Sequence, residues 1–176
     1  LPEDEEVWET VVSRFAPDGM KDLSLEDLYK YRQDMQETYS DEVELSPQVE
    51  AYLQEITKDC ATPYERLQAI EKELSGFVYN TNPGKLPQGV RSEEEFLDYF
   101  LLESKQGYCT YFATTFVLLA RAEGFPARYV EGFCVPVNQS KEMRVTSGMA
   151  HAWPEVYIEG IGWLPFEPTP GYANLR

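Results

Sequence analysis

Three residue types that together perform acyl transfer occur in three separate segments of this chain. Cys109 lies in Gly-Tyr-Cys-Thr-Tyr-Phe-Ala, His151 in Ala-His-Ala-Trp, and Glu167 in Trp-Leu-Pro-Phe-Glu-Pro-Thr-Pro. A thiol serves as a nucleophile, an imidazole as its general base, and a carboxylate as the group that orients the imidazole. Because the sequence contains a single histidine, it allows only one assembly of these three parts.

The segment around Cys109 favours a reactive thiol. Residues 108–123 are apolar on nearly every side, which is typical of a helix buried in the core, and Gly124 is placed to end it. Cys109 would lie at the start of that helix, where unpaired backbone N–H groups and the helix dipole lower the pKa of a thiol. The alternative is a buried, inert cysteine. Cys60 and Cys134 fit that alternative better, because both lie in the middle of a segment rather than at the start of a helix.

The segment from His151 to Glu167 is predicted to form a β-hairpin that joins the imidazole and the carboxylate. Residues 158–160 fit a three-residue loop that ends in a glycine with positive φ. This loop places His151 directly opposite Glu167, with Cβ atoms about 5 Å apart on one face of the sheet. Trp153 and Trp163 would share that face and exclude water. The non-catalytic alternative for the same pattern is an aromatic sheet face with one histidine that is hydrogen-bonded for structural reasons.

The other segments predict an α+β fold, in which N-terminal helices pack on an antiparallel β-sheet. Residues 127–137 are predicted as a strand and residues 138–148 as a loop. Pro154 and Pro165 cannot donate to a ladder, so parts of the hairpin are expected at a sheet edge or a bulge. Capping residues and N-terminal prolines predict helices that begin after Ser24, Ser46, Thr62 and Ser92. We divide the chain into an acidic helical extension, residues 1–45, and a core, residues 46–176.

The composition restricts the possible partners and cofactors. A net charge of −16 and a pI near 4.4 argue against nucleic acid or an anionic membrane surface as a partner. The longest purely apolar stretch, residues 116–120, is too short to span a membrane. One histidine and three scattered cysteines lack the spacing of a metal site, so we expect neither metal nor cofactor. Cys60 and Cys134 either form one disulfide or, the alternative we favour, stay buried apolar thiols.

Taken together, these motifs resemble the transglutaminase-like superfamily of papain-like cysteine enzymes. The resemblance covers about residues 46–176 and implies the papain-like transglutaminase-core fold, with Cys109 as nucleophile, His151 as base and an acid at position 167. The family more often has aspartate there, and a residue other than proline at position 154. The resemblance rests on residues 107–113 (GYCTYFA), 118–133 (LLARAEGFPARYVEGF), 151–157 (HAWPEVY) and 163–170 (WLPFEPTP).

The last two motifs look most like a bacterial branch in which this domain lies outside the cytoplasmic membrane, as part of a multi-span protein. The resemblance therefore implies an extracytoplasmic domain of a membrane-anchored bacterial protein. The chain begins with Leu1 rather than methionine, which also predicts a piece of a longer protein. The implied partner is a protein or peptide substrate, such as one of the cell envelope.

Two classes of function follow from the sequence. The first is cysteine-dependent acyl transfer or hydrolysis on glutamine side-chain or peptide amides through a thioester, as in a transglutaminase, a deamidase or a protease. The backbone N–H of Cys109 would stabilise the oxyanion, and Gln106 is a weaker candidate for a second donor. The alternative is a catalytically silent binding or scaffold module of a cell-envelope protein. Retention of all three reacting groups favours the enzyme.

Overall fold

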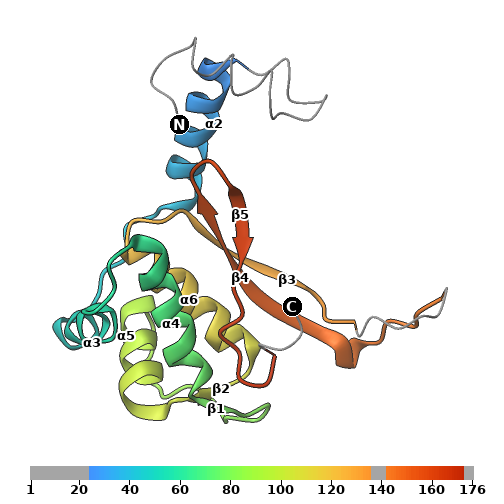
Figure 1. Ribbon diagram of the computed structural model, residues 1–176. Helices are drawn as coiled ribbons and strands as arrows, with labels where there is room; N and C mark the ends of the chain where they lie inside the picture. Colours follow the sequence, from blue (N-terminus) through green and yellow to red (C-terminus); the bar gives the residue numbers. More distant parts are fainter. Residues whose placement is uncertain (1–23, 136–141, 173–176) are drawn as a thin grey trace.

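The computed structural model describes residues 24–135 and 142–172, and its helices between residues 47 and 122 lie on one side of an antiparallel sheet (Figure 1). This arrangement confirms the predicted α+β class. The elements are α2 (Leu25–Tyr39), α3 (Pro47–Thr57), α4 (Pro63–Ser75), β1 (Val78–Tyr79), α5 (Glu93–Asp98), the π-helical turn η2 (Tyr99–Ser104), β2 (Gln106–Gly107), α6 (Cys109–Ala122), β3 (Ala127–Phe133), the 3-10 turn η3 (Ser147–Met149), β4 (Ala150–Ile158) and β5 (Gly162–Pro165).

The predicted helix starts are confirmed by their caps. Ser24, Thr62 and Ser92 each form a complete capping box with the acidic residue three positions later. Ser46 accepts the backbone N–H of Val49, and a proline is the first residue of α3. These side chains satisfy N–H groups that the first turn of a helix leaves unpaired, which is why such short signals locate helix starts.

Helix α6 is the central helix of the core, and it packs against β3 and β4 on one side and α4 on another. Phe112, Phe116 and Leu119 are fully or almost fully buried, which explains the apolar pattern on nearly every side of this helix. Gly124 follows the helix with a φ of 85° and ends it as predicted. The core therefore holds in place the helix that carries the thiol on its first residue, Cys109.

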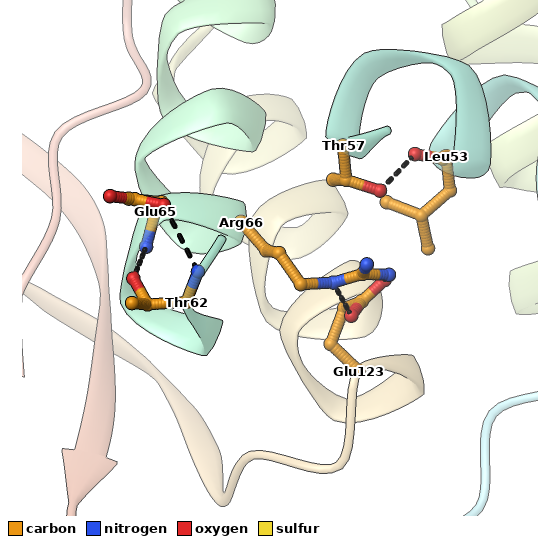
Figure 2. A network of polar contacts seen from close by, with 6 residues as sticks. All are labelled: Leu53, Thr57, Thr62, Glu65, Arg66 and Glu123. Carbon is orange, nitrogen blue, oxygen red and sulfur yellow. Dashed lines mark hydrogen bonds and ion pairs between the residues drawn. The ribbon is translucent and has the colours of Figure 1, made fainter. Parts of the chain in front are cut away.

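An ion pair fixes the other end of α6 (Figure 2). Arg66 of α4 reaches Glu123, the residue after the helix, with 2.6 Å between Nη2 and Oε1. The side chain of Glu123 is only 10% exposed. An acidic group at the C-terminus of a helix opposes the helix dipole, so the guanidinium of Arg66 compensates a charge that would otherwise be unfavourable.

The sheet has the strand order β3-β4-β5 and is antiparallel throughout, but the hairpin register differs from the predicted one. Tyr157 lies opposite Trp163, not Ile161, so the loop comprises residues 159–161. Gly160 has the expected positive φ of 79°. Gly162 also has a positive φ, 104°, and begins β5, which moves the loop one residue along the chain.

Two prolines mark the end of the pairing between β4 and β5. Pro165 lies in β5, an edge strand as predicted, whereas Pro154 lies in the central strand β4. The carbonyl of Pro154 accepts the N–H of Phe166 at 3.0 Å, but proline has no N–H to donate in return. The ladder stops here, and Glu167 lies beyond β5 rather than opposite His151 in a strand.

Helix α2 packs on the tip of the hairpin (Figure 1). Tyr39 meets Trp163 edge to face at 4.9 Å between ring centroids, and Tyr31 meets Tyr157 at 5.8 Å. None of the helices in the described part of the chain is long and apolar enough to cross a membrane. Most of the predicted extension, residues 1–23, lies outside the described residues, and the boundary at residue 45 stays a prediction. The strand predicted for residues 127–137 ends at Phe133; residues 136–141 are likewise outside.

Candidate active site

The imidazole of His151 and the carboxylate of Glu167 are in contact, although they are not strand neighbours. Nε2 of His151 lies 2.7 Å from Oε2 of Glu167. The other carboxylate oxygen accepts the backbone N–H of Thr169 at 3.1 Å, and the backbone N–H of Glu167 donates to Glu71 of α4 at 2.6 Å. Glu167 is thus held on both its main chain and its side chain, which fixes the carboxylate against the imidazole.

Cys109 is the first residue of α6, as predicted, and its side chain interacts with His151. Tyr108, the residue before the helix, provides no side-chain cap, so no capping side chain competes for the N–H groups at the helix start. Nδ1 of His151 is buried and makes no hydrogen bond within the described residues. Since Nε2 faces Glu167, Nδ1 is the nitrogen left for the thiol. The structure therefore brings all three predicted residues together.

The pKa values of the thiol and the imidazole are displaced in opposite directions. Burial raises the pKa of Cys109, but the neighbouring imidazole of His151, with its positive charge, and the backbone N–H of Ala152 lower it below its ordinary value. Burial likewise lowers the pKa of His151, but its interactions with Cys109 and Glu167 raise it to about 9. These opposite shifts favour a thiolate–imidazolium pair over a neutral thiol and imidazole.

The remaining cysteines differ from the sequence interpretation. All three cysteines are free, and Cys60 and Cys134 are half-buried rather than buried. Both follow the end of an element, Cys60 after α3 and Cys134 after the edge strand β3, where packing is incomplete. Within residues 24–135 and 142–172, no group of three or more His, Cys, Asp and Glu side chains gathers in a way that could hold a metal ion.

Gln106, the second candidate for stabilising an oxyanion, lies in β2, which pairs with β1 in a short parallel ladder. Its side-chain oxygen accepts a hydrogen bond from Nδ2 of Asn80 at 3.1 Å, which fixes the orientation of the amide. Gln106 is not among the residues that line the two clefts next to His151, which are described below, so its role stays a prediction.

Two tyrosines that the sequence interpretation missed complete the surroundings of the imidazole. The ring of Tyr172 stacks on His151 with 4.1 Å between centroids and 5° between planes. Tyr172 also hydrogen-bonds Tyr79 of β1, whose pKa is raised to about 12 by burial, by that hydrogen bond and by the charges of Tyr172, Cys109 and Glu167. An aromatic face against an imidazolium is a favourable cation–π contact. No motif or spacing signals these partners, because the contacts exist only in the folded chain.

Two clefts meet at His151. The first, which we call the thiol cleft, has a volume of about 420 Å³ and is lined by Tyr108, Cys109, Thr110, Tyr129, Glu131, Gly132, Phe133, Ala150, His151 and Ala152. The second, the aromatic cleft, has about 390 Å³ and is lined by Phe133, Cys134, His151, Trp153, Glu155, Pro165, Phe166, Glu167 and Tyr172. A group covalently bound to Cys109 would therefore lie beside open space next to the imidazole.

Comparison with known proteins gives a family match over residues 50–168 to the transglutaminase-like superfamily. The chain is 36% identical over 129 residues to the uncharacterized protein YebA of Bacillus subtilis (strain 168), covering 68% of this chain and 17% of that protein. It is 26% identical over 140 residues to a protein-glutamine gamma-glutamyltransferase of Pseudomonas aeruginosa, covering 74% of this chain and 19% of that protein. The chain thus spans less than a fifth of the length of either relative.

Among solved structures, the chain is similar to the periplasmic domain of TgpA from Pseudomonas aeruginosa. The TM-score is 0.62 at 24% sequence identity, and the match covers 81% of this chain and 48% of that chain. At this identity the likeness concerns the fold. It agrees with the arrangement of helices on an antiparallel sheet described above.

Proposed function

Because the chain belongs to the transglutaminase-like superfamily, we propose that it is a cysteine acyltransferase or hydrolase acting on glutamine side-chain or peptide amides. One observation carries the proposal: the only imidazole of the chain lies between the carboxylate of Glu167 and the thiol of Cys109. The raised pKa of His151 and the lowered pKa of Cys109 support a thiolate–imidazolium pair as the resting state.

The reaction has two halves. The thiolate of Cys109 attacks the amide carbonyl, and its own backbone N–H donates to the oxyanion. As the C–N bond breaks, the imidazolium of His151 gives its proton to the departing nitrogen, which leaves as ammonia from a glutamine side chain or as an amine from a peptide. A thioester remains. An amine or water then gives a proton to His151 and displaces the thiolate, which restores the starting pair.

Glu167 and Tyr172 act on this reaction through the imidazole. The carboxylate holds Nε2 and leaves Nδ1 toward Cys109, so proton transfer takes place at Nδ1. The stacked ring of Tyr172 covers one face of the imidazole of His151, whose side chain is only 3% exposed, and it stabilises the charged form. Both are positioning residues, because neither touches the reacting amide.

The relatives support a version of the proposal in which an amine accepts the acyl group, since one of them is named a protein-glutamine gamma-glutamyltransferase. Hydrolysis of the same thioester would give deamidation or proteolysis. The solved neighbour is a periplasmic domain, and this supports the proposal that the chain is an extracytoplasmic domain of a membrane-anchored bacterial protein. Its substrate would then be a protein or peptide amide outside the cytoplasmic membrane.

The test is a screen of glutamine-containing peptides with and without a labelled primary amine. Mass spectrometry follows amine incorporation, ammonia release and peptide cleavage in the same samples. We expect one of these products with the parent chain, none with Cys109→Ala or His151→Ala, and full activity with Cys60→Ser as the matched thiol control. Product formation that persists in folded Cys109→Ala would overturn the proposal. A folded parent that forms no product would leave the scaffold as the function.

A further inference from the structure

The thiol cleft contains a carboxylate that the proposed reaction does not use. Glu131 lies in β3, directly opposite Ala152 of β4, whose backbone N–H hydrogen-bonds Cys109. Residues opposite each other in an antiparallel pair project from the same face of the sheet, so Glu131 and Ala152 line the thiol cleft together. We propose that Glu131 recognises a cationic group of the substrate, an alkylammonium, next to the nucleophile; this inference rests on the proposed function.

A chain of hydroxyl groups fixes Glu131 relative to the nucleophile. The hydroxyl of Tyr129 donates to Oε1 of Glu131 at 2.9 Å and lies 3.3 Å from Oγ1 of Thr110, the residue after Cys109. Since the proton of Tyr129 is used on Glu131, Thr110 is the donor in the second contact. One carboxylate oxygen is thereby oriented, and the other remains for a ligand.

The two other carboxylates that line the clefts already have cationic partners. Glu167 faces His151, and Glu155 accepts two hydrogen bonds from the guanidinium of Arg128 at 2.6 and 2.9 Å. Glu131 differs: among the residues that the structure describes, its hydrogen-bond partner is the hydroxyl of Tyr129, and no lysine or arginine lines the thiol cleft. An oriented carboxylate in an open cleft without a basic neighbour favours a cationic ligand.

The charge of the whole chain acts in the same direction. A net charge of −16 raises the local concentration of cations and lowers that of anions. The cleft is therefore unsuited to acidic substrates. The ammonium could belong to a lysine near the reacting glutamine of the acyl donor or to the distal end of a diamine acceptor, and the two sources share one chemistry.

A substrate-free experiment measures this preference with charged thiol reagents. The thiolate of Cys109 attacks the sulfenyl sulfur of a methanethiosulfonate, an S–S bond forms and the sulfinate leaves. Aminoethyl (cationic), sulfonatoethyl (anionic) and methyl (neutral) reagents are compared by peptide mass spectrometry at Cys109. In Glu131→Gln we expect the cationic rate to fall and the anionic rate to rise, each about threefold, so that their ratio drops about tenfold.

The matched control is Glu44→Gln, an exposed carboxylate before α3 whose loss changes the net charge equally. This control should keep the rate ratio within about twofold, and the neutral reagent should react at the same rate with all three proteins. A ratio that is unchanged in Glu131→Gln, or that falls equally in Glu44→Gln, would overturn the inference. Far-UV circular dichroism verifies that the variants are folded.

Turnover distinguishes the source of the ammonium. One arm compares donor peptides carrying lysine or norleucine beside the glutamine; the other compares a diamine with a monoamine acceptor. For whichever substrate places its ammonium in the thiol cleft, the donor peptide or the diamine, Glu131→Gln should raise KM about tenfold and leave kcat unchanged. A variant that alters neither arm overturns the role in substrate recognition. If the parent turns over no substrate, the proposed function fails, and the reagent rates still decide whether the cleft selects cations.

Discussion

Replacement of Glu167 by glutamine should weaken the thiolate–imidazolium pair about tenfold. Contacts in the site hold the pKa of His151 at about 9, against an ordinary value of 6.5, which corresponds to about 3 kcal/mol. Cys109 and Glu167 provide this stabilisation together, and the carboxylate lies 2.7 Å from Nε2. If the carboxylate supplies half, its removal costs about 1.5 kcal/mol, or about tenfold in the population of the pair. Glutamine keeps a polar partner, so the ring stays in place.

The assay is the rate at which neutral iodoacetamide alkylates Cys109, followed by peptide mass spectrometry from mildly acidic to alkaline pH. In the parent, the half-maximal rate should fall below the ordinary pKa of a thiol, because the imidazolium stabilises the thiolate. Glu167→Gln should move the midpoint upward by about one pH unit, and His151→Ala further. Glu44→Gln should not move it. A Glu167→Gln profile that coincides with the parent's would refute the reasoning.

Three further predictions concern the pH dependence of activity, the tyrosine stacked on His151 and the ion pair at the C-terminal end of α6. kcat/KM should fall as pH drops through the lowered pKa of Cys109 and as pH rises through about 9, where His151 loses its proton, giving a bell-shaped profile. Tyr172→Ala should reduce kcat/KM about tenfold and lower the alkaline limb, whereas Tyr172→Phe, which keeps the stacked ring, should keep that limb. Arg66→Met should destabilise the chain by about 1–2 kcal/mol in urea unfolding, and adding Glu123→Gln should restore most of the loss.

The parts of the fold that depend on neighbouring residues could be predicted from the sequence. Capping residues such as Thr62 and Ser92 locate helix starts through hydrogen bonds within one turn, and these were confirmed. The same local reasoning placed Cys109 at the start of a buried helix. Placing a thiol at a helix start requires only that one helix boundary is predicted correctly, which explains why this prediction was accurate.

The hairpin register was wrong for an identifiable reason. One glycine in the predicted loop was assigned a positive φ, whereas both Gly160 and Gly162 have one, and the turn begins one residue later. Moving the turn by one residue changes the cross-strand partner of each residue in β5 by two positions. Side chains alternate between the two faces of the sheet, so Trp153 and Trp163 still share a face. The contact between His151 and Glu167 was predicted correctly but by the wrong route, since it forms after the ladder has ended at Pro154.

Contacts between distant segments could not be predicted. Tyr79, Tyr172 and His151 come from three separate parts of the chain, and no periodicity links a strand, a turn and a sheet end. The partial exposure of Cys60 and Cys134 likewise depends on how the ends of elements pack, which hydrophobic patterns do not specify. Such features follow from topology, which single-sequence patterns leave open.

The most direct test of the central claim is to trap the acyl-enzyme. The parent chain is mixed with a library of glutamine peptides without an amine acceptor, quenched in acid within one turnover and measured by intact and peptide mass spectrometry. We predict a thioester on Cys109, formed together with an equal amount of ammonia or amine, and absent from folded His151→Ala. An adduct on Cys60 or Cys134 instead, turnover without an adduct on Cys109, or neither adduct nor product with any peptide would contradict the account.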